Sequence, residues 1–328
     1  MPNRDPPLGA YMLLRQTVLY LPAQILAPLV QFASVLVWSH LLAPDQLGLV
    51  TLFVAMQEIC YLLFFGWWSL SVLRFISGYT APETRRSYVR TEAVAVGACL
   101  LAQTVILAPV VFFSYRTQLD ATGLALVLSF MLTRSLNSYS ADRARAEGFV
   151  LLYTLVQTVG PSIGFLFGLG CIWYFGPSSN AVLAGFILAQ VIGAMLSFAM
   201  SDFCRSLGIP SRQILRTAAG FGSFQSISRL LAVVAMNVPR FAVSAMLGVA
   251  AVGLFSVGYS LGIRASSFAV TLVTAGAYPL VVKKMNTEGP EAAFKQLSQN
   301  MVLVAVAVIP VAFGLMGVNR SVVELLVA

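Results

Sequence analysis

Residues 41–52 read LLAPDQLGLVTL, and residues 246–257 read MLGVAAVGLFSV. At an offset of 205 positions the two stretches share their pattern of leucine, valine and glycine, with Gly48 falling on Gly253. Each stretch connects one long hydrophobic segment to the next. An internal repeat in such an apolar chain predicts a membrane protein built from two similar lobes.

A second match follows each copy of the repeat. The loop after the next hydrophobic segment carries Pro82-Glu83 in the first half and Pro290-Glu291 in the second, each where a new helix is expected. The segment that carries Gly208 and Pro210 is the best candidate for a linker between the lobes. We therefore expect an N-terminal six-helix lobe at 1–204 and a partial C-terminal lobe at 205–328.

The composition places the chain in a membrane. Hydrophobic residues make up 59% of it and charged residues only 10%, whereas a soluble domain carries about 25% charged residues. A membrane-spanning helix needs about 20 mainly apolar residues. Nine segments meet this length, and 321–328 begins a tenth: 17–39, 47–73, 93–113, 119–136, 149–175, 181–200, 217–245, 251–281 and 298–317. The fold class is an all-α, multi-pass helical bundle.

The formal net charge of +8 indicates membrane topology rather than nucleic-acid binding. Most of the basic residues lie at the N-terminus or in alternate loops, a bias that places those loops and the N-terminus in the cytoplasm. The stretch 134–148 within them resembles a short basic surface helix. The basic residues on the predicted cytoplasmic side are Arg4, Arg15, Arg74, Arg85, Arg86, Arg90, Arg134, Arg143, Arg145, Arg205, Arg212, Arg216, Lys283, Lys284 and Lys295.

Three other arginines fall inside predicted spans. Arg229 and Arg240 lie eleven residues apart on the seventh span, so they share one side of a helix and are roughly 16 Å apart along its axis. Arg264 lies near the middle of the eighth span. An arginine at the bilayer centre costs at least ~2.5 kcal/mol and usually faces a bundle interior or a watery cavity. These three predict a cationic wall that binds a phosphate or carboxylate; the alternative is pairing with acids or snorkelling to the surface.

Three other polar side chains inside the predicted spans are candidates for function. Glu58 is the only acid away from the ends of these spans, and it is a candidate either for pairing with an arginine or for carrying a coupling proton. Gln24 and Gln31 lie seven residues apart and share one face of the first span. These glutamines are candidates for interhelical hydrogen bonds or for contact with substrate.

Nothing in the sequence assembles an enzyme. The chain has one histidine, His40, and four cysteines that are far apart without a C-x-x-C pair. It contains no nucleophile–base pair and no phosphate-binding G-x-x-x-x-G-K-[ST] loop. We expect no catalytic residues, metal or cofactor, so transport would draw on an ion gradient, the membrane potential or the gradient of the substrate.

Three passages carry a resemblance to a known family: LLAPDQLGLVTL at 41–52, NVPRFAVSAMLGVAAVGLFSVGYSLG at 237–262 and YPLVVKKMNTEG at 278–289. With them the chain resembles the polysaccharide flippases of the multidrug/oligosaccharidyl-lipid/polysaccharide (MOP) exporter superfamily. The resemblance covers nearly the whole chain and implies two six-helix lobes around a central cavity. About nine of twelve helices are present, so the chain looks C-terminally truncated. Family members carry an Asp-Arg pair in helix seven, where this chain has Pro239-Arg240.

The resemblance implies a translocase that works by alternating access in the bacterial cytoplasmic membrane. Its substrate would be an undecaprenyl-diphosphate-linked oligosaccharide for O-antigen, lipopolysaccharide or exopolysaccharide biosynthesis, with Arg229, Arg240 and Arg264 holding the diphosphate. Membrane lipids and the polymerase or glycosyltransferase machinery would be its partners. A cation-coupled multidrug exporter of the same superfamily and a non-transporting partner in polysaccharide assembly are the alternatives.

Overall fold

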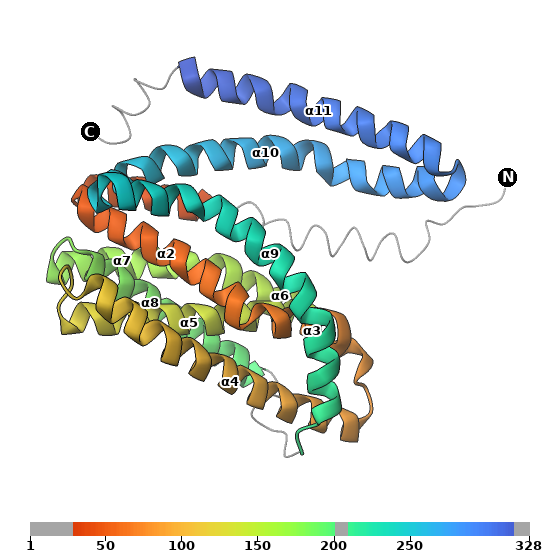
Figure 1. Cartoon of the computed structure of the whole chain (residues 1–328), viewed down its shortest axis with the longest axis horizontal. Coiled ribbons are helices and arrows are strands. Elements are labelled where there is room, and N and C mark those ends of the chain that lie inside the picture. Colours follow the sequence, from red (N-terminus) through yellow and green to blue (C-terminus); the bar gives the residue numbers. More distant parts are fainter. Residues whose placement is uncertain (1–28, 201–208, 318–328) are drawn as a thin grey trace.

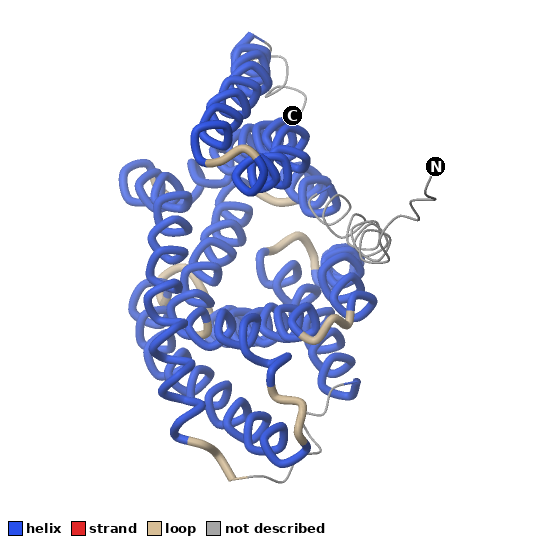
Figure 2. Tube along the Cα trace, turned by 90° about the vertical axis from the view of Figure 1, so that its right-hand side faces the viewer, coloured by secondary structure: helices blue, strands red, loops and turns tan. Residues whose placement is uncertain are grey.

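The structure, a computed structural model of the chain, describes residues 29–200 and 209–317. Every regular element in these two ranges is a helix (Figure 1, Figure 2). After a first helix at Leu29–Leu41, the elements are α2 (Pro44–Phe64), α3 (Gly66–Phe75), η1 (Ile76–Gly78), α4 (Pro82–Tyr115), α5 (Ala121–Ala146), α6 (Val150–Thr154), η2 (Leu155–Val159), α7 (Gly160–Phe175), α8 (Ser179–Met200), α9 (Arg212–Leu247), α10 (Val249–Thr287) and α11 (Pro290–Gly317).

The predicted spans fall on helices wherever the structure describes them. Seven helices in the described residues are long and apolar enough to cross a membrane. The predicted span at 47–73 is divided at Phe65 into α2 and α3. The segment 321–328 and the first part of 17–39 lie outside the described residues. The chain is a multi-pass helical membrane protein, as its composition predicts.

Two helices extend well beyond the apolar segments that predict them. α4 begins at Pro82 rather than near residue 93, and α5 continues to Ala146 rather than ending near 136. The prediction of a separate basic surface helix at 134–148 is therefore wrong. Arg143 in this stretch is only 2% exposed because it pairs with acids inside the protein, which hydropathy alone does not show.

Three helices begin in the same way, with a proline followed by an acid. Proline suits the first helical turn because its missing N–H has no helical partner there, and an acid beside it interacts favourably with the helix dipole. α4 and α11, which begin at the two matched Pro-Glu pairs, confirm that match as a structural one. The three pairs are Pro44-Asp45, Pro82-Glu83 and Pro290-Glu291.

The two glycines of the repeat lie at a close contact between α2 and α10. A Cβ atom at Gly48 would come within 2.0 Å of the main-chain oxygen of Val249, and a Cβ atom at Gly253 within 2.1 Å of that of Pro44. Val249 and Gly253 are the residues that the offset of 205 matches to Pro44 and Gly48. The two contacts are therefore one contact with the repeats exchanged, and only glycine permits the helices to approach so closely.

A pair of hydroxyl groups beside the glycines follows the same rule. The Ser256 hydroxyl donates to Thr51 Oγ1 at 3.2 Å, and these two residues are also 205 positions apart. Contacts between matched positions are what a local two-fold axis produces. The repeat thus does more than mark two similar segments, because its two copies pack directly on each other.

Buried and exposed apolar surfaces are distributed unevenly. The main core lies among α2, α3, α4 and α5, with α8 beside them, and includes the buried rings of Phe53, Phe65, Trp68 and Phe130. α10 packs against α2, α9 and α11 (Figure 1). Large apolar side chains are exposed along α4 and α11, as expected where helices meet lipid; examples are Leu101, Val105, Phe113, Met301, Val306 and Phe313.

We expect Gly253→Ala to weaken the packing of α2 on α10. The added methyl group would meet a main-chain carbonyl that has no rotamer with which to move away, at a cost of roughly 1–3 kcal/mol. Gly220→Ala in α9 is the matched control, because nothing lies within 4 Å of a Cβ atom there. The thermal midpoint of the purified protein should fall for the first variant and not for the second. Equal midpoints would show that the glycine contact is not tight.

Candidate functional site

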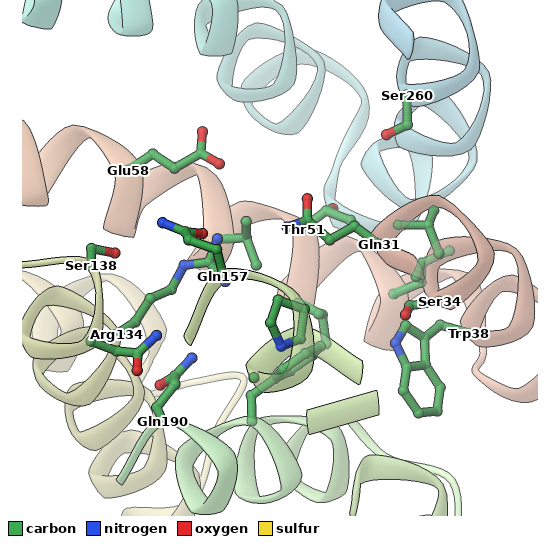
Figure 3. A pocket seen from close by; sticks show the side chains of 18 of the residues that line it. Gln31, Ser34, Trp38, Thr51, Glu58, Arg134, Ser138, Gln157, Gln190 and Ser260 are labelled. Carbon is green, nitrogen blue, oxygen red and sulfur yellow. The ribbon is translucent and has the colours of Figure 1, made fainter. Parts of the chain in front are cut away.

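A polar cavity of about 220 Å³ lies between the first repeat and the second (Figure 3). Its volume is just below the range of about 300–1,000 Å³ that encloses a whole small molecule, so it suits one part of a larger substrate. Helices α2, α5, α8, α9 and α10 contribute to it, with Leu29–Leu41 and the η2–α7 junction. The polar residues that line it are Gln31, Ser34, Trp38, Thr51, Glu58, Arg134, Asn137, Ser138, Gln157, Gln190, Arg240, Ser260 and Arg264.

Arg240 is held in this cavity by neighbours on both of its sides. Its guanidinium donates to Asn237 Oδ1 at 2.5 Å and lies over the ring of Tyr259, 5.2 Å from the centroid. Its Nε is buried and has no hydrogen-bond partner. A buried donor without a partner costs free energy, and an incoming oxyanion would supply the missing acceptor.

Arg264 approaches the cavity from α10. It lies over the ring of Phe32 at 6.0 Å, and its guanidinium is 3.5 Å from Gln31 Oε1, which is a long hydrogen bond. Arg264 is close enough to Glu58 to be attracted by its negative charge and close enough to Arg240 to be repelled by its positive charge. The structure thus brings three predicted site residues, Arg240, Arg264 and Gln31, to one cavity.

Glu58 lies opposite these arginines on α2. The Asn237 amide nitrogen donates to the Glu58 carboxylate at 3.3 Å, and the Asn237 amide oxygen accepts from Arg240. Asn237 therefore bridges the acid and the arginine. Glu58 is also the only acid among the residues that line the cavity. The alternatives of ion pairing and proton carriage both remain open to it.

Arg134 also lines the cavity, and the sequence interpretation had assigned it to a cytoplasmic loop. It lies in α5, where its Nε donates to Gln57 Oε1 at 2.8 Å. The negative charge of Glu58 is close enough to attract its guanidinium. Asn137 and Ser138 follow Arg134 by three and four residues, so they share one helical face with it. That spacing is the signal that would have placed them on a helix facing inward.

Arg229 is exposed and is not among the residues that line the cavity. Arg229 is within electrostatic range of Tyr61. The Tyr61 hydroxyl donates to Asp142 at 2.6 Å. The Ser69 hydroxyl donates to the same carboxylate. Arg229 therefore lies beside a second polar group, nearer the start of α9 than Arg240, and its role in substrate binding stays a prediction. Gln24 lies outside the described residues.

A buried ionic network joins α4 to α5 away from the cavity. Arg143 Nε donates to Glu92 at 2.7 Å and its terminal nitrogen to Glu147 at 2.9 Å. Tyr139 donates to Glu92, and Arg85 pairs with Glu147. The prediction that Glu58 is the only acid away from the ends of the spans is thus wrong, because the apolar criterion began the α4 segment one residue after Glu92, which is fully buried.

The cavity contains no arrangement for metal chemistry. Within residues 29–200 and 209–317, no three His, Cys, Asp or Glu side chains come together in a way that could hold a metal ion. What the arrangement can do is bind: it offers guanidinium groups, amides and hydroxyls around a recess. Such a lining suits a ligand with both an anionic and a neutral polar part.

A bundle of membrane-spanning helices with a polar, net cationic cavity between its two repeats is typical of a membrane transporter. The chain belongs to the family of polysaccharide biosynthesis proteins, whose model matches residues 37–328. No curated protein matches the chain.

The fold is also that of a solved structure, the inward-facing conformation of a multidrug resistance MATE family transporter of the MOP superfamily. The likeness has a TM-score of 0.65 and 17% sequence identity, and it covers 94% of this chain and 75% of that chain. At this identity the likeness shows a shared fold. The family match confirms the predicted polysaccharide family, and the shared fold is the one that the predicted MOP-type membership implies.

The ionic network yields a prediction for stability. Arg143→Leu leaves the buried Glu92 without its ion-pair partner and should cost about 3–5 kcal/mol, whereas Arg143→Leu with Glu92→Leu should recover part of that loss. Arg145→Leu, on the same helix but exposed, is the matched control. Unfolding of the purified protein in detergent measures all three. An Arg143→Leu variant as stable as the Arg145→Leu control would contradict a structural role for the network.

Proposed function

We propose that this protein is a flippase that moves undecaprenyl-diphosphate-linked oligosaccharides across the bacterial cytoplasmic membrane for polysaccharide biosynthesis. The family match and the MOP-type fold support a transporter of this class. In this proposal the N-terminus is cytoplasmic, and the lobes are residues 1–204 and 205–328. Membrane lipids and the polysaccharide polymerase or glycosyltransferase machinery are the partners.

The cationic excess of the cavity is the observation that carries the proposal. Three arginines and one glutamate line it, so its net charge favours an anion. A diphosphate fits this chemistry because guanidinium groups stay charged and bind phosphate oxygens with two parallel hydrogen bonds. Arg240 offers a buried Nε donor for such a bond, and Arg264 lies close enough to share the same anion.

Alternating access gives the glycine contact a role in this proposal. Leu47, Val50 and Thr51 line the cavity beside Gly48, so the contact of α2 with α10 closes one side of it. In the predicted orientation that side faces outward. Opening the contact would release the glycan outward, while the lipid tail stays against the exposed apolar faces of the helices.

The charge of the cavity also separates the proposal from its main alternative. A cation-coupled multidrug exporter would have to bind cationic compounds among three arginines, where like charges repel. A flippase binds an anion there. Binding of a lipid diphosphate without measurable binding of a cationic dye favours the flippase, and the opposite result favours the exporter.

We expect Arg240→Ala combined with Arg264→Ala to abolish export of surface glycan. The variant removes two charges that would hold the diphosphate, so export in a flippase-deficient strain should fall at least about 100-fold. Arg216→Ala is the matched control, since Arg216 is exposed near the start of the same helix α9. Membrane levels of all variants are compared by immunoblot.

Wild-type export by the double variant would refute the cavity as the substrate site. Arg229→Ala is tested beside it. A loss of export in that variant would extend the site toward the Asp142 group, and unchanged export would confine it to the cavity.

A further inference from the structure

The wall of the cavity that α5, η2 and α8 form carries three amide side chains beside the single charge of Arg134. Asn137 comes from α5, Gln157 from η2 and Gln190 from α8, and all three line the cavity. Figure 3 shows Gln157 and Gln190 on the same side of the cavity as Arg134. We call these three residues the amide wall.

Local structure positions each member of the amide wall. η2, which carries Gln157, is a π-helix, and single π-turns inside α-helices occur frequently at functional sites. Asn137 lies against Gly193 of α8, where a Cβ atom would come within 2.5 Å of its Oδ1. A larger residue than glycine at 193 would therefore displace the Asn137 amide.

Gln190 is only 7% exposed, so its hydrogen bonds matter. The Thr133 hydroxyl lies 2.7 Å from one end of its amide, which leaves the other end for the cavity. A primary amide supplies two donors on its nitrogen and an acceptor oxygen. Three such groups on one wall match the alternating donors and acceptors of sugar hydroxyls.

Charge distinguishes the amide wall from the opposite side of the cavity. Beside the amides, Arg134 is the only charged residue that α5, η2 and α8 contribute to the lining. On the other side, α9 and α10 contribute Arg240 and Arg264 and no amide to the lining, with Glu58 of α2 near both arginines. One wall of the cavity therefore offers three amides and one charge, whereas the other offers two arginines and no amide.

We propose that the amide wall binds a neutral, hydroxyl-bearing sugar joined to the diphosphate, while Arg240 and Arg264 bind the diphosphate itself. This inference rests on the proposed flippase function and adds the orientation of the substrate. The sugar faces the N-terminal half, and the phosphates face α9 and α10. Asn137, Gln157 and Gln190 thereby determine which glycan-bearing lipids are accepted.

Binding of three lipids to the purified full-length protein tests this assignment. The probes are a polyprenyl diphosphate, the same lipid with one neutral N-acetylhexosamine, and the same lipid with one hexuronic acid. Gln157→Met with Gln190→Met keeps side-chain size and removes both amides. It should weaken binding of the neutral glycolipid about tenfold, as expected for the loss of two neutral hydrogen bonds, and leave binding of the bare diphosphate unchanged.

Matched controls separate this inference from the function on which it rests. Gln118→Met removes an exposed amide in the turn between α4 and α5 and should change neither affinity, whereas Arg240→Ala should weaken binding of both the bare and the neutral glycosylated lipid. Unchanged binding of the bare diphosphate also shows that the double variant is folded, and Gln157→Met alone serves if the double variant does not fold.

Three results would overturn the amide wall while leaving the flippase standing. They are equal weakening of the bare and the glycosylated lipid in the glutamine variants, no change in either, and tighter wild-type binding of the hexuronic acid lipid than of the neutral one. Failure of the wild-type protein to bind any of the three lipids would instead refute the flippase proposal, and with it the amide wall.

Discussion

The close approach of α2 and α10 at Gly48 and Gly253 is the contact on which the rest of the structure depends. Each glycine faces a main-chain carbonyl of the other repeat, at a separation that no side chain permits. In a bilayer the hydrophobic effect does not drive helices together, so close packing of small residues takes its place. Thr51 and Ser256 add a hydrogen bond between matched positions.

This contact places the two repeats opposite each other, and the two repeats contribute different charged side chains to the cavity. The first repeat contributes Glu58 on α2, and the second contributes Arg240 and Arg264 on α9 and α10. Buried charges are costly unless they are paired and hydrogen-bonded, and Asn237 bridges Glu58 and Arg240 in this way. Asymmetric side chains on a nearly symmetric frame give the cavity a direction, which the proposed transport of an anionic glycolipid requires.

The sequence was sufficient to predict the helices but not how far their polar ends extend. Apolar length predicted the spans because a bilayer imposes it. The same criterion ended helices at charged residues, so Glu92 and Arg143 were assigned outside spans and Arg134 to the cytoplasmic side, although their side chains have partners on neighbouring helices. Such partners depend on tertiary packing. The repeat was visible in the sequence, but nothing there indicated that its copies touch, and the π-turn that carries Gln157 left no recognisable pattern.

The most direct test of the account joins the glycine contact to transport. Cysteines at Thr51 and Ser256, whose hydroxyl oxygens are 3.2 Å apart, should form a disulfide in a variant without the native cysteines. Translocation of a fluorescent polyprenyl-diphosphate oligosaccharide is then measured in proteoliposomes before oxidation, after it and after reduction. If the contact of α2 with α10 must open for transport, transport should stop on oxidation and return on reduction. Equal rates in the oxidised and reduced protein would contradict the account.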